Sequence, residues 1–221
     1  MNDSFMLNKL QLDASPIRIG DNTLDLLTVT NIEPLLLELE KKDKTTLASF
    51  PYWIKIWESS IVLAAYLAEQ TMDKNRTVLE LGAGMGVVGL FLAAAGHPVT
   101  LTDCNPDALA LLKKNAERNG LTSVTVRQLD WNHFESPGSF DIVCGAELVY
   151  RQADIQPAMT AVRKSIKPEG TVYLAHDIKR LSMIDFLAEA GKHFEIAHTG
   201  KSMTMGGEKK QVVIHIMTPK G

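Results

Sequence analysis

The 221-residue sequence has little of what several protein classes require. It holds two cysteines, Cys104 and Cys144, too few for a disulfide framework or a cysteine-based zinc site, and we expect both to be buried. Its longest apolar run, residues 87–95, is about half of the roughly 20 residues that span a bilayer. Residues 1–10 lack the cationic and apolar segments of a signal peptide, which predicts a cytoplasmic protein without a membrane anchor.

Clusters of basic residues are also missing. The chain has 23 Lys and Arg against 26 Asp and Glu, a formal net charge of −3. Nucleic-acid backbones are bound by clustered basic side chains, so we expect no nucleic-acid partner. The 6 histidines show no metal-ligand spacing, so we expect no metal. What is present is an ordinary globular composition, with 45% hydrophobic and 22% charged residues.

From residue 77 onward, apolar runs alternate with helix-like segments, which is typical of βαβ units around a parallel sheet. Two later runs, 193–199 and 211–217, are joined by a polar Gly-rich segment without room for a crossover helix. They predict an antiparallel hairpin at the edge of an α/β sheet, with Lys201, Lys209 and Lys210 on its loop. The five earlier strand-like runs are residues 77–81, 99–103, 124–128, 140–145 and 171–175.

Residues 1–76 read as an N-terminal β/α extension of a core at 77–217, within a single domain over 1–221. Short strands are expected between residues 10 and 30, followed by two helices, at 32–42 and 60–70. The segment between the helices, residues 50–57, is densely aromatic. It is either a hydrophobic lid on the core or a pocket wall over a flat ligand.

A glycine turn follows the first strand of the core and opens a helix, as a nucleotide-cradling loop requires. Two registers are possible: residues 84–89 satisfy the dinucleotide pattern GxGxxG, whereas Glu80 with Gly82, Gly84 and Gly86 gives acidic-x-GxGxG. We prefer the second, because it begins directly at the strand end. It also places a carboxylate at the turn, which suits a cationic ligand better than a pyrophosphate.

Carboxylates recur at the ends of the predicted parallel strands, where open α/β sheets bind ligands. Asp103 can accept the two hydroxyls of a ribose. Asp130 offers an acceptor for an exocyclic amine, and the neighbouring Trp131 offers a ring surface for an adenine. Glu147 follows the fourth strand, with Tyr150 three residues later.

These motifs resemble those of the class I, seven-β-strand methyltransferases that use S-adenosylmethionine. The resemblance covers roughly residues 51–217 and rests on ELGAGMG at 80–86, on Asp103 and on the terminal hairpin. It implies a Rossmann-like, doubly wound sheet with strand order 3-2-1-4-5-7-6, in which strand 7 is antiparallel.

A closer resemblance is to methyltransferase family 16, which contains many protein lysine methyltransferases. It rests on Trp57 before a helix, on the pair Asp130-Trp131, and on the acidic-x-x-aromatic motif formed by Glu147 and Tyr150. Two departures are the Glu at 147, where the family usually has Asp, and Asn132, where Gly commonly follows the Trp.

The resemblance implies methyl transfer from S-adenosylmethionine to a nitrogen nucleophile, with a protein lysine as the first acceptor and a small amine as the alternative. An NAD(P)-dependent oxidoreductase that uses the GxGxxG register is a more distant alternative. Glu147 and Tyr150 would act on the acceptor, whereas His176-Asp177 is a weaker candidate for proton transfer. The implied cofactor-binding residues are Trp57, Glu80, Gly82, Ala83, Gly84, Gly86, Asp103, Asp130, Trp131 and Glu147.

Overall fold

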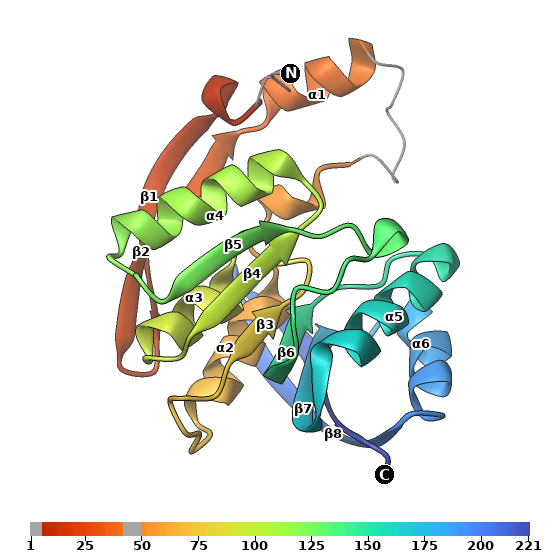
Figure 1. Cartoon of the computed structure of the whole chain (residues 1–221). Helices are drawn as coiled ribbons and strands as arrows, with labels where there is room; N and C mark the ends of the chain where they lie inside the picture. Colours follow the sequence, from red (N-terminus) through yellow and green to blue (C-terminus); the bar gives the residue numbers. More distant parts are fainter. Residues whose placement is uncertain (1–5, 42–49) are drawn as a thin grey trace.

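A seven-stranded mixed sheet lies at the centre of the computed structural model, which describes residues 6–41 and 50–221 (Figure 1). Its order is β5-β4-β3-β6-β7-β9-β8, and β9 runs antiparallel to both of its neighbours. Counted along the chain within this sheet, that order is 3-2-1-4-5-7-6 with strand 7 antiparallel, so the predicted fold class is confirmed. The strands are β3 (Val78–Glu80), β4 (Val99–Asp103), β5 (Val124–Gln128), β6 (Phe140–Ala146), β7 (Ile166–Asp177), β8 (Phe194–Met205) and β9 (Glu208–Pro219).

Helices cover both faces of the sheet and divide the core into two clusters. Residues alternate between the faces along each strand: Val78 of β3 packs in one cluster and Leu79 in the other. One face carries α2 (Glu58–Ala68), α3 (Val87–Ala94) and α4 (Pro106–Arg118), and the other carries α5 (Ile155–Ser165) and α6 (Ser182–Ala190). Single 3-10 turns are η1 (Met6–Lys9), η3 (Tyr52–Ile54), η4 (Trp131–His133) and η5 (Gln152–Asp154).

Local signals set the start of α4. The Asn105 side chain accepts hydrogen bonds from the backbone N–H groups of Asp107 and Ala108, and Pro106 occupies the first turn. Beyond the helix, Gly120 has a φ of 63°, the left-handed conformation that stops a helix. Both signals are visible in the sequence, because Asn105-Pro106 is typical of a helix start and Asn119-Gly120 of a helix stop.

The N-terminal extension is an antiparallel hairpin of β1 (Gln11–Ile19) and β2 (Asn22–Asn31), followed by α1 (Glu33–Lys41). Figure 1 shows the hairpin beside α4, outside the central sheet. Residues 1–5, in the segment judged to lack a signal peptide, and residue 42, at the end of the first predicted helix, lie outside the described residues.

Two asparagines, Asn115 in α4 and Asn119 just after it, hold this hairpin through hydrogen bonds to the backbone of β2. The N–H of Leu27 donates to Asn115 Oδ1 at 2.7 Å, and Asn115 Nδ2 donates back to the Leu27 carbonyl at 3.4 Å. One turn later, the N–H of Asp25 donates to Asn119 Oδ1 at 2.8 Å, and Asn119 Nδ2 donates to the Asp25 carbonyl at 3.1 Å. The backbone N–H and carbonyl groups of Asp25 and Leu27 on β2 are thus all paired with the side chains of these asparagines.

The C-terminal hairpin is longer than predicted. Its strands extend to Gly206 and Gly207, which form the turn with φ values of 59° and 81°. The expected loop at 200–210 is therefore mostly strand, and its three lysines lie on β8 and β9. This part of the hairpin is largely exposed, so it lacks the apolar alternation by which a strand is recognised.

The prediction for the cysteines was right for only one of them. Cys144 is buried within β6, whereas Cys104 is exposed just beyond the end of β4. Among the described residues, no helix is both long enough and apolar enough to cross a membrane.

Replacing Asn115 with alanine should loosen the N-terminal hairpin. The change leaves the N–H and carbonyl of Leu27 without partners, and we expect it to lower the free energy of unfolding by about 1–3 kcal/mol in urea titrations. Lys114→Ala, at an exposed position of the same helix, is the matched control and should change stability by less than about 0.5 kcal/mol. Equal losses in the two variants would contradict the proposed role of Asn115.

Candidate active site

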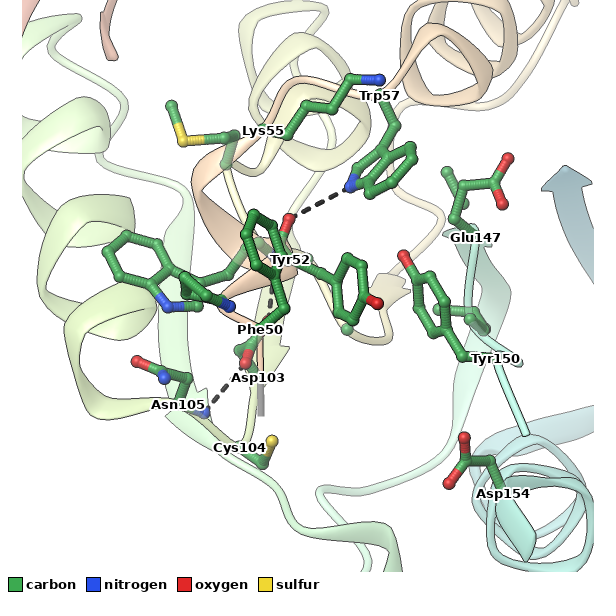
Figure 2. A pocket seen from close by; sticks show the side chains of 18 of the residues that line it. Phe50, Tyr52, Lys55, Trp57, Asp103, Cys104, Asn105, Glu147, Tyr150 and Asp154 are labelled. Atoms are coloured by element: carbon green, nitrogen blue, oxygen red, sulfur yellow. Dashed lines mark hydrogen bonds between the residues drawn. The ribbon is translucent and has the colours of Figure 1, made fainter. Parts of the chain in front are cut away.

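A cavity of about 450 Å³ opens at the carboxyl ends of β3, β4 and β6 (Figure 2). Its walls come from the glycine turn, the ends of the parallel strands, the aromatic segment before α2, and the loop after β6. Gly86 is the one predicted site residue that does not line it. The predicted residues that do line it are Trp57, Glu80, Gly82, Ala83, Gly84, Asp103, Asp130, Trp131, Glu147 and Tyr150.

The glycine turn follows the acidic-x-GxGxG register. Gly82, Gly84 and Gly86 have φ values of 55°, 51° and 75°, in the left-handed region that favours glycine. Gly86 is the residue preceding α3, and a Cβ there would lie 2.3 Å from Leu112 Cδ2 of α4. Its role is therefore close packing between helices, which explains why it stays out of the cavity.

Glu80 ends β3 beneath the first turn of α3. The N–H of Gly89 donates to Glu80 Oε2 at 2.8 Å, so the carboxylate lies at the helix N-terminus. The side chain is nearly fully buried, and this burial raises its pKa from 4.5 to about 8, with a further contribution from the charge of Asp103. The protein without ligand therefore holds a proton on Glu80 at neutral pH, and a bound cation would favour its release.

Asp103 ends β4 opposite the glycine turn. Its Oδ2 accepts the N–H of Gly84 and its Oδ1 accepts the N–H of Asn105, both at 2.9 Å. Burial raises the pKa of Asp103, and these two backbone hydrogen bonds oppose the rise. The two bonds fix the orientation of a carboxylate whose other lone pairs face the cavity.

Asp130 and Trp131 form the opposite rim. Asp130 accepts hydrogen bonds from the N–H of Asn132 and from His133 Nδ1, each at 2.9 Å, and the His133 bond is the largest cause of its lowered pKa. The indole of Trp131 packs against the glycine turn, within 3.5 Å of the place where a Cβ on Gly82 would stand. A flat ligand resting on Trp131 would therefore lie beside the turn.

Three aromatic side chains form the wall on the far side of the cavity. Tyr52 and Tyr150 stack with ring centroids 4.7 Å apart and planes at 20°. Trp57 lies about 6 Å from each, at 6.1 and 6.2 Å, and its Nε1 donates to the Tyr52 carbonyl at 3.1 Å (Figure 2). Sequence reasoning singled out the aromatic segment as either a lid or a wall, and the structure places Tyr52 and Trp57 in a wall.

Glu147 is held in a single position by its surroundings. It has a φ of 54°, and its side-chain Oε1 accepts the N–H of Asp177 at 2.7 Å. Arg180 donates to Glu147 Oε2 from Nε at 2.9 Å and from Nη2 at 2.5 Å, and its guanidinium lies 4.4 Å from the ring centroid of Tyr150. Sequence reasoning missed Arg180, because no local pattern links the loop after β7 to a residue 33 positions earlier.

The weaker candidate pair, His176 and Asp177, is separated because adjacent residues of a strand point to opposite faces of the sheet. Only the backbone N–H of Asp177 contacts Glu147, whereas the His176 side chain is buried, with its Nε2 2.9 Å from that of His215. Burial lowers the pKa of both histidines, that of His215 to about 4. In residues 6–41 and 50–221, no group of three or more His, Cys, Asp or Glu side chains is arranged to hold a metal ion.

The fold is that of solved S-adenosylmethionine-dependent methyltransferases. The superposition with a solved S-adenosylmethionine-dependent methyltransferase from Agrobacterium tumefaciens covers 94% of this chain and 70% of that protein's chain. Its TM-score is 0.61 at 19% sequence identity. At that identity the likeness shows the fold alone.

The chain belongs to the lysine methyltransferase family, whose model matches residues 37–193. EEF1A lysine methyltransferase 3 of Mus musculus is 32% identical over 130 residues, which are 57% of this chain and 56% of the mouse protein. Protein N-lysine methyltransferase METTL21A of Xenopus tropicalis is 30% identical over 148 residues, 64% of this chain and 68% of the relative. The match thus spans little more than half the length of the mouse relative.

The raised pKa of Glu80 predicts a specific pH dependence of stability. Between about pH 4.5 and pH 8 the folded protein holds a proton that the unfolded chain has released, so the free energy of unfolding falls as pH rises. Glu80 contributes up to about 1.4 kcal/mol per pH unit to this slope. In Glu80→Gln the contribution is absent, so the variant should gain stability relative to the wild type as the pH of urea titrations rises. Glu117→Gln, an exposed control on α4, should keep the wild-type slope, and an unchanged slope in Glu80→Gln would contradict the assignment.

Proposed function

We propose that the protein transfers a methyl group from S-adenosylmethionine to the side-chain nitrogen of a lysine in a protein. The observation that carries this proposal is one cavity lined by the glycine turn, Asp103 and the motif of Glu147 and Tyr150, in a chain of the lysine methyltransferase family. The names of the mouse and frog relatives support a lysine acceptor. A low cysteine content supports a cytoplasmic location. The slight acidic excess supports a protein partner over a nucleic acid.

The residues present fit this cofactor. Glu80 is a buried carboxylate without a cationic partner among the described residues, which suits the ammonium of a methionine moiety. Asp103, oriented by two N–H groups, suits ribose hydroxyls, and Trp131 and Asp130 suit an adenine and its amine. The left-handed glycines let the backbone approach the ligand closely. Trp57, as part of the aromatic wall, would bound the cofactor on that side.

When bound, S-adenosylmethionine would supply a methyl group on a sulfonium: the nitrogen of an uncharged amine would bond to the methyl carbon as the carbon–sulfur bond breaks, the electron pair of that bond would stay on sulfur, and the methylated nitrogen would carry the positive charge as an ammonium. The chain's own part is to align the reactants and to exclude water. Tyr52, Trp57 and Tyr150 surround the acceptor's place with apolar ring surface, while Glu147 orients the amine. Burial also raises the pKa of Tyr150, so its hydroxyl stays neutral and acts as part of the wall.

A small-molecule amine is the second candidate acceptor, since the cofactor side of the cavity would be the same. The oxidoreductase alternative is disfavoured, because the left-handed glycines follow the acidic-x-GxGxG register and the family model is that of a lysine methyltransferase. The two acceptors are separated by incubating the protein with methyl-labelled S-adenosylmethionine and host lysate. We expect label on lysine residues of protein after hydrolysis, and label confined to small molecules would overturn the protein-lysine proposal.

Two substitutions should separate cofactor binding from transfer. Asp103→Asn removes a carboxylate at the ribose position, and we expect S-adenosylmethionine affinity in calorimetry to fall at least about tenfold. Glu147→Gln keeps the shape of the side chain, and we expect near-normal cofactor affinity with transfer to the labelled protein reduced at least about tenfold. Unchanged transfer by the Glu147 variant would remove that residue from the mechanism.

A further inference from the structure

A second cavity of about 550 Å³ lies against the back of the aromatic wall. Lys55, Trp57, Glu147 and Tyr150 line both cavities, so these residues lie between the two spaces. The second cavity therefore borders the aromatic wall on the side away from the glycine turn. The charged side chains that line this cavity would therefore affect the protonation state of an amine inside it.

Cationic side chains slightly outnumber carboxylates along the second cavity, whereas carboxylates predominate along the first. The cations lining it are Lys55, Lys179, Arg180 and Lys210. The carboxylates lining it are Glu58, Glu147 and Asp177. Lys55 pairs with Glu58 at 3.4 Å and its ammonium lies 4.4 Å from the ring centroid of Trp57. Lys210 pairs at 2.8 Å with Glu208, just outside the cavity. This lining therefore offers little net attraction for an incoming cation.

The inner end of the cavity is neutralised by one ion pair. The Glu147 side chain is 2% exposed and that of Arg180 is 22% exposed, so the pair is shielded from water. Both Glu147 oxygens already accept hydrogen bonds, from Arg180 and from the N–H of Asp177. Arg180 also occupies the face of Tyr150, which is where a cation would gain most from the ring. An ammonium that reaches this end finds Arg180 already in contact with Glu147 and Tyr150, the two groups that would otherwise attract it.

We propose that the second cavity receives the acceptor side chain and that Arg180, by pairing with Glu147, makes its inner end admit the amine in uncharged form. This inference rests on the proposed function. A free lysine has a pKa of about 10.4, so roughly one in a few thousand is uncharged at neutral pH. Desolvation and the nearby positive charges of Arg180 and Lys55 both favour loss of the proton before the amine reaches the methyl donor. Arg180 is thus a positioning residue that acts through Glu147 and through its charge.

The other titratable groups near this ion pair do not replace it. His176 near the end of β7 is buried, and this burial lowers its pKa, which favours the uncharged imidazole. Asp177 at the end of β7, Lys179 on the loop that carries Arg180, and Lys210 of β9 also line the second cavity. The backbone N–H of Asp177, rather than its carboxylate, contacts Glu147. The charge of Arg180 is therefore the one whose removal changes the inner end most.

The test uses n-butylamine, an analogue of the lysine side chain, and the full-length protein loaded with S-adenosylhomocysteine. Calorimetry near pH 8 in two buffers of different ionisation enthalpy gives the number of protons released on binding. We expect about one proton per bound amine for the wild type, and an apparent affinity that rises about tenfold per pH unit between about pH 7 and pH 9.

Arg180→Gln should reverse this behaviour. It leaves Glu147 buried without its cation, so the amine should bind as ammonium, with almost no proton release and an affinity nearly independent of pH. Arg180→Lys keeps the charge and should retain the release. Lys179→Gln removes a cation that lines the same cavity outside the Glu147 ion pair, and it should also behave as the wild type.

Three results would overturn the inference: no butylamine binding by the wild type, binding without proton release by the wild type, or equal proton release by Arg180→Gln. If Arg180→Gln does not fold, loss of proton release by Arg180→Lys decides against the inference, because only charge is claimed to matter. Cofactor binding, measured separately, distinguishes the two proposals. A protein that binds and uses S-adenosylmethionine but takes up butylamine without releasing a proton contradicts this inference alone, whereas failure to bind S-adenosylmethionine contradicts the proposed function.

Discussion

The site depends on how closely helix α3 approaches the sheet. Within its first turn, a Cβ on Gly89 would stand 2.2 Å from Leu101 Cδ2 and 2.7 Å from Glu80 Oε2, so glycine alone fits there. This approach lets the N–H of Gly89 reach the carboxylate of Glu80 beneath it. The chain from the end of β3 to the start of α3 must then turn sharply, which explains the left-handed φ values at residues 82, 84 and 86. The floor of the first cavity is a consequence of this packing.

The two cavities differ in how their carboxylates are satisfied. In the described part of the chain, Glu80 and Asp103 accept backbone N–H groups and have no cationic partner, and burial raises the pKa of both. Glu147, by contrast, is paired with Arg180. Burial without a cation raises the free energy of the ionised form of both carboxyl groups, which is why their pKa values rise, and a ligand that carries positive charge offsets this cost. The side of the aromatic wall that is lined by Glu80 and Asp103 therefore suits a cationic ligand, whereas on the other side Arg180 supplies the cation for Glu147.

Much of this arrangement could be predicted from the sequence, because it rests on local signals and on the geometry of parallel sheets. The strand-ending position of Asp103 and the cap at Asn105 are examples, since each is read from a few neighbouring residues. The partner of Glu147 could not be predicted, because Arg180 approaches it only through the tertiary fold. The exposure of Cys104 was missed for a similar reason: it follows a buried strand in sequence but lies outside the sheet in space.

The aromatic wall joins the extension to the core, since Tyr52 lies before α2 and its stacking partner Tyr150 follows β6. In the proposed reaction, one positive charge crosses this wall, from the side lined by Glu80 and Asp103 to the side where Arg180 has already neutralised Glu147. After transfer, the acidic side faces a neutral thioether and the neutralised side holds a new ammonium. Both products then sit where the electrostatics favour them less than the reactants, so the same charge arrangement that admits an uncharged amine also promotes product release.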